Sequence, residues 1–321
     1  MKIYQNFVGI DIGKYVFVVA STDSNTVKEF NNTPEGITEF FANYKKVLTK
    51  ALVILETTGG YEMDLLFSLC QKSIDVHRAN TRKVKHFIRS YGNGAKTDGL
   101  DAKALSLYGK ERYEKLECYK PLNKEVIALY YLVKRREDLT KMLSAEKNRK
   151  QAPGAKTLLS SYSKVIEVLQ EEIHILDKQA AELIASHEAL QACKKILETI
   201  PGIGQIISTY LLAYIPELGM MNRRQIASLC GLAPRANDSG TYRGYRHTSP
   251  GRESVKPKLF LAAMAARNAK GTLKDFYEKL IAGGKKKMVA LTALMRKIIV
   301  IANAKIRDYL VSNGQFLTQP E

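Results

Sequence analysis

The sequence predicts an α/β amino-terminal domain, a helical coiled-coil segment in the middle and a mostly α-helical carboxy-terminal domain. Three observations indicate this architecture. In residues 1–118, short apolar runs typical of strands alternate with segments whose apolar residues have the spacing of a helix. Residues 119–190 are charged and glycine-poor. Residues 191–321 have a helical pattern except for one long polar loop. With 321 residues, 45% of them hydrophobic, the chain can bury the cores of two or three domains.

The amino-terminal domain opens with short strands. The predicted strands cover residues 7–11, 15–21, 27–31, 51–57 and 73–80. Predicted helices cover residues 33–48, 61–72 and the segment after residue 80. The run "ALVILET" (51–57) is continuously apolar, as a central parallel strand is. The resulting order, three strands, helix, strand, helix, strand, helix, is that of the ribonuclease H fold.

Asp11 is the most unusual residue of this domain, because it interrupts the apolar first strand of "VGIDIGKYVFVVA" (8–20). A buried carboxylate without a partner is costly, which raises the question of what Asp11 faces. Actin-like ATPases and sugar kinases also begin with a strand that ends in Asp-x-Gly. They carry a second Asp-Gly strand that binds phosphate, and the sequence contains none.

Three further acids follow at positions suited to a metal site. Glu56 closes "ALVILET", and Asp98 and Asp101 lie one helical turn apart in "KTDGLDAKAL". Four converging carboxylates suit one or two Mg²⁺ ions, and two ions can hold both oxygens of a phosphodiester under attack. Each acid also has an ordinary structural interpretation: Asp98 as a helix N-cap, Asp101 as a first-turn acid and Glu56 as a surface residue.

The charge of the chain points to a polyanionic partner. The formal net charge is +18, which attracts polyanions. Nucleic acid is the commonest of these, and an anionic membrane surface is the other option. The segment "TRKVKHFIRSYGNGAK" (81–96) contains no acid and is either a solvated helix face or a phosphate-binding face. Its basic residues are Arg82, Lys83, Lys85, Arg89 and Lys96.

Several classes of protein are disfavoured. No run of about 18 apolar residues is present, and the sequence starts directly with a strand, so we expect neither a membrane span nor a signal peptide. Four widely separated cysteines and five scattered histidines show no zinc-site spacing. We expect reduced thiols in a cytoplasmic protein.

The middle segment carries a seam of the coiled-coil kind. Apolar residues step by three and four, and "QAPGAK" (151–156) separates two helices, so a helical hairpin is expected. The seam could pack within the chain or form the arm of a dimer or tetramer. Its residues are Ile166, Leu169, Ile173, Leu176, Ala180 and Leu183.

The carboxy-terminal domain contains two candidate sites. "TIPGIGQIISTYLLAYI" (199–215) is similar to a helix-hairpin-helix element, or is a tight turn between packed helices. The polar loop 233–254 holds Ser239 among Arg235, Arg243, Arg246 and Arg252. A hydroxyl among guanidinium groups is suited to attack on a phosphate, since arginine neutralises the developing charge. Tyr242 and Ser249 are rival nucleophiles.

These motifs together resemble a known family. "GIDIGK", "ETTGGY", "KTDGLDAKAL", "IPGIG", "IASLCGLAPRANDSGTYRG" and "AGGKKKMVALTALMRKI" follow one another in the order seen in the DEDD transposases of the insertion sequence 110 family, relatives of Piv-type DNA invertases. The resemblance extends over almost the whole chain. The sequence departs from it after the serine loop, where "SPGRESVKPKL" replaces an expected lysine–glycine–asparagine-like step.

The resemblance implies a RuvC-like domain (1–118), a coiled-coil oligomerisation segment (119–190) and a transposase domain (191–321). It places the family's acidic quartet, which holds Mg²⁺, on Asp11, Glu56, Asp98 and Asp101, and the serine nucleophile on Ser239. It further implies a covalent phosphoserine link to DNA, guidance by a structured non-coding RNA, a tetrameric assembly and a bacterial, nucleoid-associated location.

Other activities remain open from the residues alone. A RuvC-like nuclease that uses metal-activated water would need the quartet but not Ser239. A DNA invertase would share the whole site, and a binding protein with a decayed site would need none of these acids.

Overall fold

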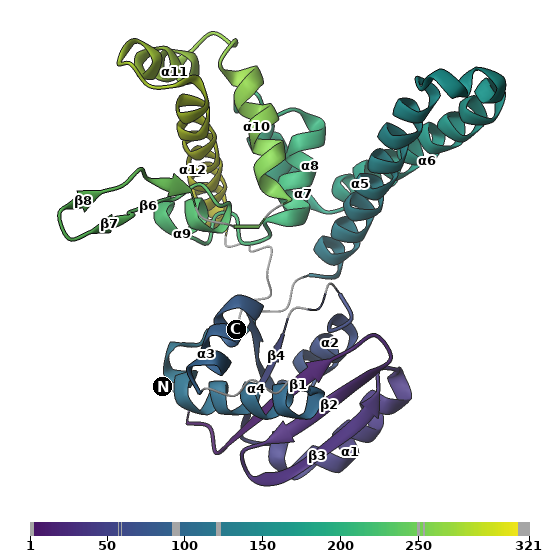
Figure 1. The fold of residues 1–321 in the computed structure, drawn as a ribbon, viewed down its shortest axis with the longest axis vertical. Helices are drawn as coiled ribbons and strands as arrows, with labels where there is room; N and C mark the ends of the chain where they lie inside the picture. The colour runs from purple at the N-terminus through teal and green to yellow at the C-terminus, as the bar shows by residue number, and fades with distance from the viewer. Residues whose placement is uncertain are drawn as a thin grey trace. The chain divides into compact units, whose positions relative to one another are not determined.

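The computed structural model describes residues 3–56, 58, 60–91, 97–119, 123–248, 251–252 and 254–313. The chain divides into two compact units, Met1–Pro121 and Leu122–Glu321, here called the amino-terminal unit and the helical unit (Figure 1). The division of the helical unit into an oligomerisation segment and a transposase domain stays a prediction.

A five-stranded mixed sheet forms the amino-terminal unit. Its strands run in the order β3-β2-β1-β4-β5, with β1 antiparallel to β2 and parallel to β4. The predicted order of strands and helices is confirmed, and the arrangement is ribonuclease H-like. The strands are β1 (Asn6–Ile12), β2 (Val16–Ser21), β3 (Ser24–Asn31), β4 (Ala51–Glu56) and β5 (Asp75–Ala79).

Helices cover both faces of this sheet. Residues of α1 (Pro34–Leu48) and α2 (Met63–Gln71) share one buried cluster with the strands, and residues of α3 (Thr81–Ser90) and α4 (Asp98–Arg112) share another on the opposite face. Figure 1 shows α4 crossing its face of the sheet. A Cβ at Gly9 would lie 2.1 Å from the backbone oxygen of Ala102, so only glycine allows α4 to approach β1 this closely.

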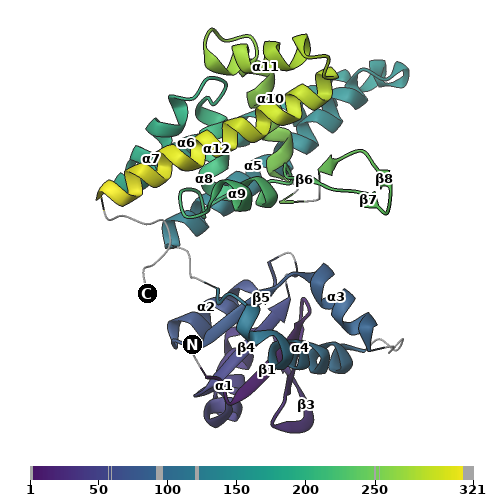
Figure 2. The same cartoon turned by 90° about the vertical axis from the view of Figure 1, so that its left-hand side faces the viewer.

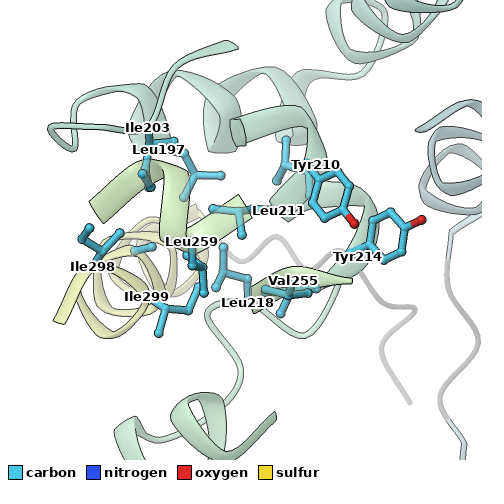
Figure 3. Close-up of a cluster of buried hydrophobic side chains, with 14 of the residues drawn as sticks. Leu197, Ile203, Tyr210, Leu211, Tyr214, Leu218, Val255, Leu259, Ile298 and Ile299 are labelled. Carbon is cyan, nitrogen blue, oxygen red and sulfur yellow. The ribbon is translucent and has the colours of Figure 1, made fainter. Parts of the chain in front are cut away.

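The helical unit is built around the long helix α12, which packs against α7, α9, α10 and α11 (Figure 2). Leu197, Leu211, Leu259 and Ile299 come from four different helices and are buried in one apolar cluster (Figure 3). The helices are α5 (Lys124–Lys150), α6 (Leu159–Ala185), α7 (Glu188–Glu198), α8 (Gln205–Tyr214), α9 (Arg223–Leu229), α10 (Val255–Ala266), α11 (Thr272–Ala282) and α12 (Lys287–Asn313), with short 3₁₀ turns at Tyr113–Lys115 and Pro153–Leu158.

The predicted helical hairpin is formed by α5 and α6, which pack along each other. All six residues of the predicted seam are buried or half-buried. Arg136, which interrupts the apolar stripe of α5, pairs with Asp177 of α6 at 2.5 Å. Packing within the chain therefore accounts for the seam, and contact with a second copy stays a prediction.

The "PGIG" segment is a tight turn between α7 and α8. Gly202 has φ of +90°, and a Cβ there would lie 2.2 Å from the backbone oxygen of Ala262 in α10. This side of the turn is therefore occupied by protein. No helix in the described ranges is long and apolar enough to cross a membrane.

The polar loop is more ordered than its turn-rich sequence suggests. It forms two small antiparallel pairs, β6 with β9 and β7 with β8. The strands are β6 (Pro234–Arg235), β7 (Asp238–Ser239), β8 (Tyr242–Arg243) and β9 (His247–Thr248). The β7–β8 hairpin projects away from the helices of its unit (Figures 1 and 2).

Candidate active site

Asp11 and Glu56 lie next to each other at the ends of neighbouring parallel strands. Ile10 of β1 is in register with Leu55 of β4, so the following residues, Asp11 and Glu56, are adjacent across the ladder. Side chains alternate along a strand. Because Phe7 and Ile54 belong to the cluster beneath α3 and α4, Asp11 and Glu56 face the same side.

The third carboxylate comes from α4, which covers that face. Thr97 caps α4 by accepting the backbone N–H of Leu100 at 3.3 Å, so Asp98 is the first helical residue rather than the cap. Asp101 follows one turn later and is half-buried, whereas Asp98 is exposed. We call Asp11, Glu56 and Asp101 the acidic edge.

The carboxylates of the acidic edge repel one another. Burial, followed by the negative charges of Asp11 and Asp101, raises the pKa of Glu56, although a hydrogen bond from the Thr81 hydroxyl and the charge of Lys85 act in the opposite direction. Proton uptake relieves this repulsion, and so would a bound cation.

The chemistry of this set fits Mg²⁺, which prefers carboxylate oxygens. In the part of the chain that the structure describes, however, no three His, Cys, Asp or Glu side chains stand close enough together to hold an ion. The assignment of metal ligands, Asp98 included, therefore stays a prediction.

The basic helix α3 starts directly beside the acidic edge. Thr81, its first residue, bonds Glu56, while Val84 and Phe87 are buried against the sheet. The predicted phosphate-binding residues Arg82, Lys83, Lys85 and Arg89 are all exposed, and Lys96 lies outside the described residues.

Ser239 is presented in a different way, at the end of an exposed hairpin. It pairs with Tyr242 across a turn in which Gly240 has φ of +55°. Tyr242 is 65% exposed and Tyr245 is 87% exposed. Ser239 is exposed as well, so the hydroxyl and phenol groups of this hairpin are accessible within the helical unit. The rival nucleophile Ser249 falls outside the described residues.

The four loop arginines do not share one environment. Arg235 and Arg243 are exposed, and Arg246 pairs with Asp238, the neighbour of Ser239, at 3.1 Å. Arg252 instead donates to both carboxylate oxygens of Glu217, at 2.8 and 2.9 Å, and to the backbone oxygen of Tyr214. Burial would lower the pKa of Arg252, but Glu217 raises it above its ordinary value.

Arg252 therefore anchors the end of the loop to the body of the helical unit, and its contact with nucleic acid stays a prediction. The sequence gives no sign of this role, because Glu217 lies 35 residues earlier. A second residue that sequence reasoning missed is Glu62, which is fully buried in the loop after β4.

The structure thus groups Asp11, Glu56 and Asp101 in the amino-terminal unit and places Ser239 in the helical unit. A ribonuclease H-like sheet with carboxylates at the ends of β1 and β4, beside a basic helix, is the arrangement expected of an enzyme that acts on nucleic acid strands. Comparison with known proteins identifies which kind.

Residues 8–153 match the family model of the IS110 DEDD transposases, described as "Transposase". Residues 194–278 match the model described as "Transposase IS116/IS110/IS902 family". The chain belongs to the IS110 family of DEDD transposases.

Two curated relatives align along nearly the whole chain. The pilin gene-inverting proteins of Moraxella lacunata and Moraxella bovis are each 29% identical over 319 residues, which covers 95% of this chain and 96% of each relative. The protein is thus an enzyme of the transposase and DNA invertase class, with DNA as its substrate and the divalent-metal chemistry that the DEDD family implies.

Proposed function

We propose that the enzyme cuts and rejoins DNA through a covalent bond between Ser239 and the DNA backbone. The Ser239 Oγ bonds to phosphorus and loses its proton, and the bond from phosphorus to one deoxyribose oxygen breaks. That oxygen takes up a proton and leaves as a free hydroxyl. In the joining step the hydroxyl of another strand attacks the phosphoserine and releases Ser239, so no water or external energy source is consumed.

The exposed position of Ser239 among arginines carries this proposal. Its hydroxyl lies at the end of a projecting hairpin, with Arg243 on the paired strand and Arg246 bound to the adjacent Asp238. Guanidinium groups can form bidentate hydrogen bonds with the phosphate oxygens of DNA and stabilise the charge that develops during attack.

The acidic edge (Asp11, Glu56 and Asp101) would hold Mg²⁺, together with Asp98, which lies in α4 as Asp101 does. A divalent ion held there would supply positive charge to neutralise phosphate oxygens and developing negative charge. The residues themselves keep a fixed geometry, because Asp11 and Glu56 belong to the hydrogen-bonded ladder and α4 packs on β1 at Gly9.

Two further partners belong to the proposal, a structured guide RNA and additional copies of the chain. The net charge of +18 and the basic residues in both units support contacts with more than one nucleic acid strand. Exposed apolar residues on α6, Val165 at 44%, Val168 at 59% and Ile175 at 40%, support a contact between copies in a dimer or tetramer.

Covalent trapping tests the serine mechanism. The protein is produced with the non-coding RNA that flanks its element, incubated with Mg²⁺ and labelled donor DNA carrying a nick that prevents rejoining, and run on a denaturing gel. We expect a labelled protein–DNA adduct that Ser239→Ala abolishes, that Asp11→Asn weakens and that the rival-nucleophile variants Tyr242→Phe and Ser249→Ala retain.

The same gel separates the alternatives. Cleaved DNA without an adduct, unchanged in Ser239→Ala, would identify a nuclease that uses water. Inversion of a segment between two sites is the second candidate, favoured by the alignment with pilin gene-inverting proteins over almost their full length. Substrates with inverted sites and substrates with element ends distinguish inversion from transposition.

A further inference from the structure

Glu62 is a fully buried acid in the loop that follows β4. Four groups donate to its carboxylate: the backbone N–H of Thr58 at 3.2 Å, the Thr58 hydroxyl at 2.8 Å, the N–H of Gly60 at 2.9 Å and the Arg78 guanidinium at 2.5 Å. Burial alone would raise the pKa of Glu62, but these hydrogen bonds and Arg78 hold it below the ordinary value. These donors therefore favour the ionised form of the buried carboxylate.

These hydrogen bonds, here called the ring, connect residues on both sides of the end of β4. Thr58 and Gly60 come two and four residues after Glu56. On the other side, Arg78 lies in β5, in register with Leu55, the residue before Glu56. Glu62 thus ties the chain that leaves Glu56 back to the neighbouring strand, and Gly60 follows this path with φ of +121°.

A second contact joins this loop to the strand that carries Asp11. The Asn32 side-chain amide donates to the backbone oxygen of Tyr61 at 3.0 Å and to that of Gly13 at 3.1 Å. Gly13 comes two residues after Asp11, and Tyr61 precedes Glu62. Asn32 therefore bridges the loops that follow the two carboxylate-bearing strands.

The ring does not reach a substrate, because Glu62 has no exposed surface. Its hydrogen bonds, together with those of Asn32, act on the backbone of the two loops that follow β1 and β4. These loops set where the ends of β1 and β4 stand relative to each other.

We propose that Glu62, bonded to Arg78 and linked through Asn32, is a positioning residue that fixes the spacing of Asp11 and Glu56 for a divalent cation. This inference rests on the proposed metal role of the acidic edge. Partners that orient metal ligands typically account for 10–100-fold in metal affinity, and a carboxylate that acts through a loop belongs at the lower end of that range.

The test is to measure the binding of Mn²⁺ to the full-length protein by isothermal titration calorimetry in the absence of DNA. We expect Glu62→Gln and Asn32→Ala each to weaken Mn²⁺ binding about tenfold. Asp64→Asn, an exposed acid two residues away, and Asn43→Ala, an exposed asparagine on α1, serve as matched controls and should bind as the wild type does.

A double variant separates positioning from general damage. If Glu62 acts through Glu56, adding Glu62→Gln to Glu56→Gln causes no further loss of Mn²⁺ binding. In cleavage of donor DNA, Glu62→Gln should raise the Mg²⁺ concentration for half-maximal rate while retaining most of the rate at saturating Mg²⁺. A purely structural role would lower the melting temperature and the active fraction without moving that concentration.

Each result decides between the proposals. Wild-type affinity for Mn²⁺ in both Glu62→Gln and Asn32→Ala would overturn the positioning role while leaving the metal site intact. If Glu62→Gln does not fold, Asn32→Ala, which removes only two bonds to carbonyls, decides alone. Failure of the wild type to bind Mn²⁺ more tightly than Asp11→Asn would overturn the metal site and, with it, this inference.

Discussion

The acidic edge and the Ser239 hairpin are built in opposite ways. The edge stands on a five-stranded sheet, with Gly9 in contact with α4 and Glu56 tied to Thr81, so its side chains are held by the core beneath them. The hairpin has strands of two residues, and Ser239 and Tyr242 are exposed. The proposed roles fit this difference, because carboxylates that share an ion need fixed spacing, whereas a nucleophile that attacks DNA must be accessible.

The two regions should differ most in how much stability is lost when a glycine is replaced by alanine. In Gly9→Ala the new Cβ would lie 2.1 Å from the Ala102 oxygen and 2.3 Å from the Ser106 nitrogen, so α4 must move off β1. We expect a loss of about 3 kcal/mol or more in the free energy of unfolding, together with loss of DNA cleavage, because Asp101 moves with α4.

Gly240→Ala is the matched change in the hairpin. No atom lies within 4 Å of the added Cβ, and only the positive φ of +55° opposes it, so the expected cost is about 1 kcal/mol. Chemical denaturation with urea measures both variants. Equal losses would show that the hairpin is as tightly packed as the sheet edge and would break the comparison.

Within the loop itself, Arg252 and Arg243 should behave differently. Arg252→Ala removes the two bonds to Glu217 and the bond to Tyr214, and we expect a loss of about 1–2 kcal/mol in stability, since the pair is about one-third exposed. Arg243→Ala should leave the melting temperature unchanged and weaken DNA binding. Thermal unfolding and DNA titration of both variants check this. If Arg243→Ala lowers the melting temperature and Arg252→Ala weakens only DNA binding, Arg243 is the anchor and Arg252 the DNA contact.

The basic helix α3 offers a test by salt. If Lys83 and Arg89 each contact a phosphate, replacing either by Gln should reduce the slope of log affinity against log salt concentration by about 0.9. Lys45→Gln, an exposed lysine of α1 on the other face of the sheet, is the control and should leave the slope unchanged. A shift of equal size in the control would mean that net charge, not this helix, sets DNA affinity.

The sequence predicted the regular part of the molecule well, for a physical reason. Strand and helix periodicity is local, so the order of elements and the α5–α6 hairpin followed from apolar spacing. Asp11 was recognisable because a charge interrupted an apolar strand. These features needed no knowledge of which strands pair.

What the sequence could not predict depends on contacts between distant residues. Glu217 and Arg252, or Glu62 and Arg78, look like ordinary surface charges until the fold brings them together. Arg252 was grouped with Arg235 and Arg243 because composition does not distinguish a bonded arginine from an exposed one. The cap of α4 on Thr97 rather than Asp98 was likewise a choice between neighbours of similar propensity.

The smallest expected effect concerns the stability of the acidic edge itself. Because burial and the charges of Asp11 and Asp101 raise the pKa of Glu56 in the folded protein, the fold favours its protonated form. Glu56 therefore contributes fully to the free energy of unfolding at a pH below the ordinary glutamate pKa. This contribution is lost as the pH rises through the raised pKa of Glu56 in the folded protein. At pH 7 without divalent ions, Glu56→Gln should therefore melt slightly higher than the wild type.

That difference should shrink as the pH falls below the ordinary glutamate pKa of about 4.3, because Glu56 then becomes protonated in the unfolded state as well. Added Mg²⁺ should stabilise the wild type more than Glu56→Gln, because an ion that binds only the folded state raises its stability. Ser239→Ala, in the exposed hairpin, should melt as the wild type does under every one of these conditions. A lower melting temperature for Glu56→Gln at pH 7 would show that the hydrogen bond from Thr81 outweighs the repulsion, and that the edge is stable without a cation.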